Sequence, residues 1–258
     1  MDKDKTHFGF KSVPKSEKAD HVAKVFQSVA KQYDLMNDLM SLGTHRLIKR
    51  MTVELTRARP GHQIMDLAGG TGDLTELLAK KVGPQGQVIL CDINEAMLDA
   101  GRDRLYDKGI LSNVQFVLGD AESLPFPEQY FDAVTLAFGI RNVTDKARAL
   151  AETRRTLKYG GKLIILEFSK LTLPALQPAY KAFSGLWPKV GEWITGDSQP
   201  YQYLIESIKM HPDQESFADM MRTAGFSNVS YENVAGGVVA IHQGTNTDTT
   251  ASPIQRDN

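Results

Sequence analysis

Cysteine is almost absent from the sequence, which contains only Cys91. A single cysteine forms neither an internal disulfide nor a CxxC metal site, so a reducing, cytoplasmic compartment is expected. No apolar run approaches the roughly 18 residues that span a bilayer, and no transmembrane segment is predicted. The first five residues carry early acids and no apolar stretch, which argues against a secretory signal and a mitochondrial transit peptide.

The sequence also has no excess of charge of either sign, since it contains 30 lysines and arginines and 31 aspartates and glutamates. The net charge of −1 supplies no basic field, so no nucleic-acid partner is expected. The six histidines show no H-x-x-x-H spacing, and no metal site is expected either. What remains is a soluble globular chain of 258 residues, long enough for one large domain or two small ones.

Hydrophobic periodicity divides the chain into segments. Residues 1–60 are expected to form a helical N-terminal lid, because apolar residues from Val22 to Tyr33 follow the spacing of one helix face. Between residues 61 and 168, short apolar runs alternate with helical patterns, which predicts a doubly wound parallel sheet and a cofactor-binding core. Predicted strands cover residues 63–67, 87–91, 114–118, 131–138 and 162–168, and predicted helices cover residues 73–82, 95–107 and 146–158.

The alternation stops after residue 168. Residues 169–212 are expected to form a helical cap, and residues 213–244 a helix followed by a β-hairpin that adds an antiparallel edge to the sheet. Residues 245–258 are rich in Thr, Asn, Asp and Ser without periodicity, which predicts a disordered tail. The sequence therefore predicts a single domain over residues 1–244.

A glycine-rich turn joins the first predicted strand to its helix and reads Asp66-Leu67-Ala68-Gly69-Gly70-Thr71-Gly72-Asp73. Glycines let a ligand approach the backbone closely, and the N-terminus of a helix offers unpaired N–H groups. Asp92 ends the second predicted strand, which neighbours the first at the switch point of a doubly wound sheet. An acid at that position can accept hydrogen bonds from both hydroxyls of a ribose.

Two nucleoside cofactors fit such a turn, and a purely structural turn is the third interpretation. A dinucleotide fingerprint needs G-x-G-x-x-G/A, but the third position counted from Gly70 is Thr75. The pattern [D/E]-x-x-G-x-x-G suits the cationic S-adenosylmethionine, because Asp66 can support the turn and the aminoacyl end of the ligand. The predicted S-adenosylmethionine contacts are Asp66, Gly69, Thr71, Gly72 and Asp92, with Asp120 and Ala121 after the third strand and Ala137 at the end of the fourth.

Several motifs resemble those of the ubiquinone/menaquinone biosynthesis C-methyltransferases, from about Thr6 to Gly244. They are the glycine-rich turn, Tyr33-Asp34-Leu35-Met36-Asn37-Asp38-Leu39-Met40-Ser41-Leu42-Gly43-Thr44-His45-Arg46, Phe138-Gly139-Ile140-Arg141-Asn142-Val143, Leu166-Glu167-Phe168-Ser169 and Met210-His211-Pro212-Asp213-Gln214. The N-terminal and Phe-Gly-Ile-Arg-Asn motifs are specific to that family. Two positions depart from its usual pattern, with Ile48 in place of Trp and Tyr159 in place of Pro.

The resemblance implies a class I methyltransferase with a Rossmann-like fold, whose central seven-stranded sheet is mostly parallel. It implies transfer of a methyl group from S-adenosylmethionine to a ring carbon of a polyprenylated quinol. The implied substrates are demethylmenaquinol and 2-polyprenyl-6-methoxy-1,4-benzoquinol, in menaquinone and ubiquinone biosynthesis.

Arg141 and Asn142 are the predicted catalytic residues, because they follow the fourth strand at the carboxyl edge where such sheets place their ligands. Arginine is a poor base, so Arg141 is expected to stabilise the phenolate of the substrate or to orient a water molecule. Asn142 is expected to hold a ring oxygen. Tyr33, Asn37 and Asp38 are candidates for closing the site from the N-terminal lid.

A substrate with an apolar tail also implies peripheral contact with the inner face of the plasma membrane, for which basic residues around Arg46 and Arg50 are candidates. A homodimer and a complex with other quinone-biosynthesis enzymes are further expectations. Three other functions stay open at this point. They are a class I methyltransferase acting on another small molecule, an NAD-dependent oxidoreductase, and a subunit that holds the cofactor without chemistry.

Overall fold

A seven-stranded sheet forms the centre of the computed structural model, which describes residues 4–29, 41, 43–110 and 112–248. The strands lie in the order β5-β4-β3-β6-β7-β9-β8, and the first five of them run parallel. This mostly parallel sheet with an antiparallel edge confirms the predicted fold class. The parallel strands are β3 (Gln63–Leu67), β4 (Gln87–Asp92), β5 (Val114–Leu118), β6 (Phe131–Ala137) and β7 (Leu157–Phe168).

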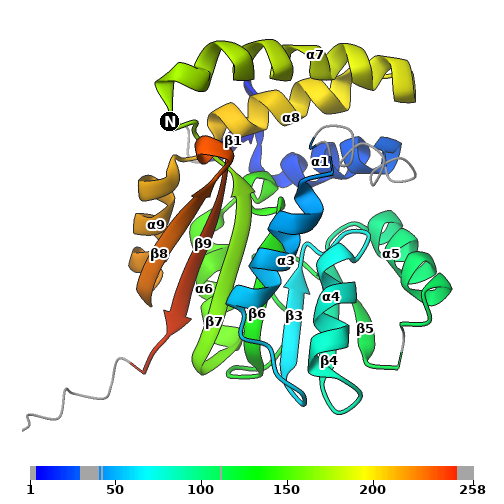
Figure 1. Ribbon diagram of the computed structural model, residues 1–258, viewed down its shortest axis with the longest axis vertical. Coiled ribbons are helices and arrows are strands. Elements are labelled where there is room, and N and C mark those ends of the chain that lie inside the picture. The colour runs from blue at the N-terminus through cyan, green and yellow to red at the C-terminus, as the bar shows by residue number, and fades with distance from the viewer. Residues whose placement is uncertain (1–3, 30–40, 42, 111, 249–258) are drawn as a thin grey trace, which may run out of the picture.

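Helices cover both faces of the sheet, which explains why its central strands are apolar throughout (Figure 1). On one face, Leu78 and Leu105 pack on Leu90 of β4. On the other face, Leu150 and Phe217 pack on Leu136 and other buried strand residues. The first face carries α3 (His45–Leu55), α4 (Asp73–Val82) and α5 (Glu95–Asp107), and the second carries α6 (Lys146–Thr156) and α9 (Gln214–Thr223).

The antiparallel edge consists of β8 (Phe226–Val234) and β9 (Val239–Asn246), joined by the 3-10 turn η4 (Ala235–Gly237). Strand β9 runs two residues past the predicted boundary at residue 244. It is held there because the buried Asn246 donates from Nδ2 to the Leu157 carbonyl at 2.7 Å. The prediction of disorder from residue 245 onward is therefore wrong for the end of β9, and residues 249–258 lie outside the described residues.

The N-terminus begins with a β-hairpin, and the prediction of an entirely helical segment over residues 1–60 is wrong there. Strands β1 (Lys5–Phe8) and β2 (Lys11–Pro14) pair antiparallel ahead of α1 (Lys15–Val29). Gly9 makes the turn with φ of +58°, and the Phe10 N–H donates to Glu206 of the cap at 3.0 Å. Contacts with a segment about 200 residues away, rather than local periodicity, thus stabilise this hairpin.

A helical cap follows β7, as expected, and lies across the carboxyl end of the parallel strands (Figure 1). Its helix α8 (Gln199–Met210) packs beneath the outermost helix α7 (Gln177–Thr195). Trp187, Leu204 and Ile208 form its apolar cluster together with Phe168 at the end of β7. Two short 3-10 turns complete the described elements, η2 (Ile140–Asn142) after β6 and η3 (Pro174–Leu176) before α7.

Candidate active site

The glycine-rich turn between β3 and α4 depends on the absence of side chains. A Cβ on Gly69 would lie 2.9 Å from Cγ of Leu90 and 3.1 Å from Oδ2 of Asp66. Gly70 and Gly72 adopt φ of +54° and +80°, a region that residues with a Cβ rarely enter. The glycines therefore allow the backbone of this turn to pack closely against neighbouring side chains.

Asp66 lies beneath the turn rather than in a large cavity. Its carboxylate accepts hydrogen bonds from Thr75 at 2.7 Å and Thr135 at 2.9 Å, and it is almost completely buried. Burial raises the pKa of Asp66 to about 6. With Gly69 and Thr71 it lines a small cavity of about 30 Å³, so its direct contact with the cofactor stays a prediction. Thr75, which replaces the third glycine of a dinucleotide fingerprint, is thus a structural partner of Asp66.

We expect Asp66→Asn to change how stability depends on pH. The folded pKa of Asp66, about 6, is higher than the ordinary 3.8, so folded protein keeps the proton that unfolded protein releases. Asp66 therefore lowers stability as pH rises from about 4 to 6, by about 3 kcal/mol at pH 7. Urea unfolding at pH 4 and pH 7.5 should show Asp66→Asn gaining stability relative to the wild type at the higher pH. Equal differences at both pH values would contradict this prediction, and the exposed Asp107→Asn is the control.

Asp92 holds the turn from the neighbouring strand. Its Oδ2 accepts from the Gly70 N–H at 2.9 Å, and its Oδ1 accepts from the Asn94 N–H at 2.9 Å. Burial raises its pKa above the ordinary value, although the backbone N–H groups of Asn94, Gly70 and Ile93 act to lower it. Each carboxylate oxygen keeps a further lone pair, so Asp92 can still accept hydrogen bonds from a ligand.

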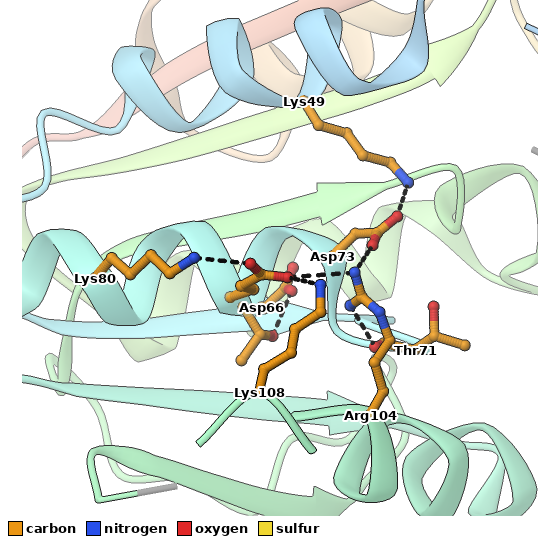
Figure 2. A network of polar contacts seen from close by, with 9 residues as sticks. Lys49, Asp66, Thr71, Asp73, Lys80, Arg104 and Lys108 are labelled. Carbon is orange, nitrogen blue, oxygen red and sulfur yellow. Dashed lines mark hydrogen bonds and ion pairs between the residues drawn. The ribbon is translucent and has the colours of Figure 1, made fainter. Parts of the chain in front are cut away.

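A network of charged residues fixes the other side of the same turn, as Figure 2 shows. Lys49 extends from α3 to Asp73, the first residue of α4, at 2.5 Å. Arg104 of α5 pairs with Asp73 and Glu76 and donates to the Thr71 carbonyl at 3.0 Å. Burial acts to raise the pKa of Asp73, but Lys49 and Arg104 hold it below its ordinary value. The turn is therefore clamped between α3 and α5.

A cavity of about 600 Å³ lies above the turn, and we call it the cofactor cavity. It collects four of the eight predicted cofactor residues, while Asp66, Gly69, Thr71 and Gly72 do not line it, and helix α1 closes it from the N-terminal side. The carboxylates of Asp92 and Asp120 lie beside apolar wall residues, a pattern that suits a nucleoside with a ribose diol and an apolar base edge. Gly70 of the turn also lines the cavity, so a nucleoside such as that of S-adenosylmethionine can approach the backbone closely there. Predicted residues on its wall are Asp92, Asp120, Ala121, Ala137 and Asn142, and the turn contributes Gly70.

A second cavity of about 380 Å³, which we call the apolar cavity, adjoins the first. Phe26 of α1 and Phe138 after β6 line both. Its walls come from α1, α3, the cap, the carboxyl end of β7 and the amino end of the antiparallel β9. They include Ile48, Phe168, Phe183, Trp187, Leu204 and Val239, with Arg141 and Tyr203. Ile48, one of the two departures from the family pattern, thus lies on the wall of this cavity.

Arg141 and Asn142 lie in η2, where the two cavities meet. Arg141 lines the apolar cavity, is only 8% exposed, and pairs with Glu167, which is 1% exposed, at 2.8 Å. Its guanidinium also donates to the Phe138 carbonyl and lies 5.5 Å from the centre of the Phe168 ring. Asn142 faces the cofactor cavity. The structure therefore holds a fixed cation beside an apolar space.

Two residues at this junction escaped the sequence interpretation. Glu167 belongs to the Leu-Glu-Phe-Ser motif, which is a signal that could have identified it. Tyr203 of α8 donates from its hydroxyl to Oδ1 of Asn142 at 3.0 Å, and no local pattern points to it. Burial raises the pKa of Tyr203 to about 12. A tyrosine and an arginine are both unsuited to accept a proton here, so both serve as hydrogen-bond donors.

Other predicted or candidate residues lie elsewhere. Tyr33, Asn37 and Asp38 fall outside the described residues, and their role as a lid stays a prediction. Cys91 is fully buried in β4, and burial raises its pKa to about 12, which makes it unreactive. Across residues 4–29, 41, 43–110 and 112–248, no group of three or more His, Cys, Asp or Glu side chains could hold a metal ion.

Comparison with known proteins agrees with this geometry. Residues 12–246 match the model of the ubiE/COQ5 methyltransferase family. A ubiquinone/menaquinone biosynthesis C-methyltransferase UbiE from Stutzerimonas stutzeri is 59% identical over 240 residues, covering 93% of this chain and 94% of that protein. The protein of the same name from Yersinia enterocolitica is 55% identical over 245 residues, covering 95% and 98%.

Solved structures share the fold at low sequence identity. A SAM-dependent methyltransferase from Aquifex aeolicus has a TM-score of 0.60 at 16% identity, covering 83% of this chain and 98% of that chain. The [4+2]-cyclase SpnF has a TM-score of 0.65 at 16% identity, covering 89% and 96%. Because a cyclase shares the fold, the fold alone does not assign the chemistry. The family model and the close relatives do so, and the chain belongs to the ubiE/COQ5 family of S-adenosylmethionine-dependent methyltransferases.

Proposed function

We propose that this chain transfers a methyl group from S-adenosylmethionine to a ring carbon of polyprenylated quinols. The products are menaquinol from demethylmenaquinol, and the methylated form of 2-polyprenyl-6-methoxy-1,4-benzoquinol. The observation that carries the proposal is the junction of two unlike cavities. One has acidic residues suited to a nucleoside, the other is apolar and of a size for a quinol ring, and a fixed arginine lines the apolar one.

Each side of the junction has a defined task in this reaction. Bound S-adenosylmethionine supplies an electrophilic methyl group. The quinol hydroxyl would give its proton to solvent, and the Arg141 guanidinium would stabilise the phenolate that forms. The neighbouring ring carbon would take the methyl group as the carbon–sulfur bond breaks and S-adenosylhomocysteine leaves, and loss of the ring proton to solvent would restore the aromatic ring. Glu167 keeps the guanidinium in place through two hydrogen bonds, one to the Arg141 backbone N–H at 3.2 Å and one to Nη1 at 2.8 Å. Phe26 and Phe138 line both cavities at the junction, and alignment of the two reactants lowers the barrier further.

The direct test is methyl transfer to a defined substrate. Purified protein with isotopically labelled S-adenosylmethionine and a short-chain demethylmenaquinol should give labelled menaquinol, identified by mass spectrometry. A close analogue that already carries the ring methyl should stay unlabelled. Absence of labelled product with a folded protein that binds S-adenosylhomocysteine would overturn the quinol assignment, and it would favour another small-molecule acceptor.

The apolar substrate leads to a second proposal, that the cap contacts the membrane from which the quinol is drawn. In the described part of the chain, no helix has the length and hydropathy to cross a bilayer. Exposed apolar side chains lie at the start of η3 and along α7, where Leu173, Leu176 and Leu186 are 51%, 45% and 54% exposed. Leu176 and Leu186 follow helical spacing with Phe183, which also lines the apolar cavity. We therefore favour α7 over the basic residues of α3 as the membrane face.

Leu176→Ser together with Leu186→Ser should weaken binding to vesicles of phosphatidylethanolamine and phosphatidylglycerol by roughly tenfold or more, because each leucine loses its apolar burial in the lipid. Vesicle sedimentation measures this effect. Turnover of a detergent-soluble short-chain quinol should stay unchanged, since neither side chain lines the cavities. Tyr159→Ser, at the opposite end of β7, is the control. A second double variant, Arg46→Ala with Arg50→Ala, tests the basic residues of α3. If it alone loses vesicle binding, α3 and not α7 contacts the membrane.

Association with other chains remains a prediction. A homodimer and a complex with other enzymes of quinone biosynthesis would both bring the apolar substrate to the cap without passage through water. Light scattering of the purified chain tests the first, and co-purification from membranes tests the second. Cytoplasmic location on the inner face of the plasma membrane is proposed on the same grounds.

A further inference from the structure

Tyr203 connects the cap to the centre of the site. It belongs to α8, lines the apolar cavity, and donates from its hydroxyl to Oδ1 of Asn142 at 3.0 Å. Asn142 belongs to η2 and lines the cofactor cavity. This hydrogen bond therefore joins a cap residue to a core residue across the junction of the two cavities.

The N-terminal hairpin holds the Tyr203 ring in place. Phe8 of β1 stacks on it with ring centres 4.4 Å apart and planes inclined by 21°. Phe8 also contacts His21 of α1, whose ring centre lies 5.1 Å away. The hydroxyl position is thus set by two elements that the sequence pattern did not assign to the site, the hairpin and α8.

The hydrogen bond decides which way the Asn142 amide faces. An asparagine side chain has one acceptor oxygen and a donor NH₂ group on opposite sides. With Oδ1 engaged by Tyr203, the NH₂ group is directed away from the tyrosine. Among the described residues Asn142 Nδ2 makes no hydrogen bond, and Asn142 is only half-buried. A donor of fixed direction is therefore available at the junction.

We propose that Tyr203 is a positioning residue for methyl transfer, which orients the Asn142 amide so that its NH₂ group donates to an oxygen of the quinol ring. The inference rests on the proposed function for its substrate. It goes beyond that function because it assigns the cap, and the hairpin that packs on it, a role in orienting the quinol ring. Tyr203 takes no proton in this scheme, because its hydroxyl stays protonated below a pKa of about 12.

The test compares Tyr203→Phe with the exposed control Tyr106→Phe. Phenylalanine keeps the ring and its stacking on Phe8, so folding should be retained, as thermal unfolding would show. We expect kcat for demethylmenaquinol to fall about tenfold, which corresponds to about 1.4 kcal/mol for one lost hydrogen bond. The quinol KM should change less than twofold, and calorimetry should give an unchanged Kd for S-adenosylhomocysteine. The loss should be constant from pH 6 to 9, since the Tyr203 hydroxyl, with a pKa of about 12, stays protonated throughout that range.

A double-mutant cycle with Asn142→Ala separates positioning from general damage. If Tyr203 acts through Asn142, Tyr203→Phe should change kcat less than twofold in the Asn142→Ala background. Full additivity of the two effects would overturn the inference, and so would wild-type kcat in Tyr203→Phe.

An activity-independent measurement covers the case in which the quinol assignment itself fails. The side-chain NH₂ signals of Asn142 in a ¹H–¹⁵N spectrum, assigned by their loss in Asn142→Asp, should shift in Tyr203→Phe but not in Tyr106→Phe. Unshifted signals would mean that the hydrogen bond does not hold the amide, whatever the substrate is. Shifted signals without methyl transfer by the wild type would place the failure in the proposed function instead.

Discussion

Arg141→Ala should lower kcat by about 10²- to 10³-fold while the Kd for S-adenosylhomocysteine changes less than twofold. The guanidinium lines the cavity in which a quinol oxygen would develop negative charge, and removal of such a stabilising donor has an effect of this size. It lines the apolar cavity and not the cofactor cavity, which is why cofactor affinity should persist. Single-turnover methyl transfer and calorimetry measure the two quantities.

The ion pair with Glu167 requires a control for stability. Arg141→Ala leaves a carboxylate that is 1% exposed without its cation, which typically destabilises a protein by about 3–5 kcal/mol. Arg141→Met combined with Glu167→Gln removes both charges and should recover most of that loss. If this folded, neutral pair is still inactive, the missing cation and not the damaged fold explains the result. Turnover at the wild-type rate in either variant would contradict the assignment of Arg141.

Arg141→Lys tests the geometry of the charge. Lysine keeps the positive charge but cannot reproduce the planar donor set that contacts Glu167 and the Phe138 carbonyl at the same time. We expect an intermediate rate, closer to Arg141→Ala than to the wild type. The comparison therefore asks whether a cation suffices or whether it must be fixed in place.

The parts of this architecture that the sequence predicted are those with a local signal. Strands covered on both faces appear as continuous apolar runs such as Leu163 to Leu166, and the turn between β3 and α4 is marked by its glycines. The structure also places Asp92, Asp120 and Ala137 on one cavity, because carboxyl ends of parallel strands meet at one edge. Asp66 is an exception among the predicted cofactor residues, because its carboxylate accepts hydrogen bonds from Thr75 and Thr135 beneath the turn.

What could not be predicted depends on contacts between distant segments. The hydrogen bond between Tyr203 and Asn142 joins residues 61 positions apart, and neither the periodicity of α8 nor its composition indicates it. No local sequence pattern predicts the hairpin of β1 and β2 either. Its four-residue strands are mostly polar, and contacts with Glu206 and Tyr203 stabilise it. Such features become visible only when the cap is placed over the sheet.

Asp92→Ala should raise the Kd for S-adenosylhomocysteine by about 10- to 150-fold. The carboxylate faces the cofactor cavity at the end of β4, and a charge-assisted hydrogen bond to a ribose hydroxyl contributes about 1.5–3 kcal/mol. Its loss also leaves the Gly70 N–H without its acceptor, which loosens the turn. Calorimetry gives the Kd, and Asp107→Ala at the exposed end of α5 is the control.

A ligand with one ribose hydroxyl removed separates the two contributions of Asp92. If Asp92 binds the ribose, the 2′-deoxy analogue of S-adenosylhomocysteine should bind the wild type more weakly than S-adenosylhomocysteine itself. Asp92→Ala should bind both ligands with nearly equal affinity, because the group that distinguishes them is gone. If the variant discriminates as well as the wild type does, Asp92 supports the turn without touching the ribose. The acid that recognises the cofactor would then have to be another carboxylate on the same wall, and Asp120 is the next to test.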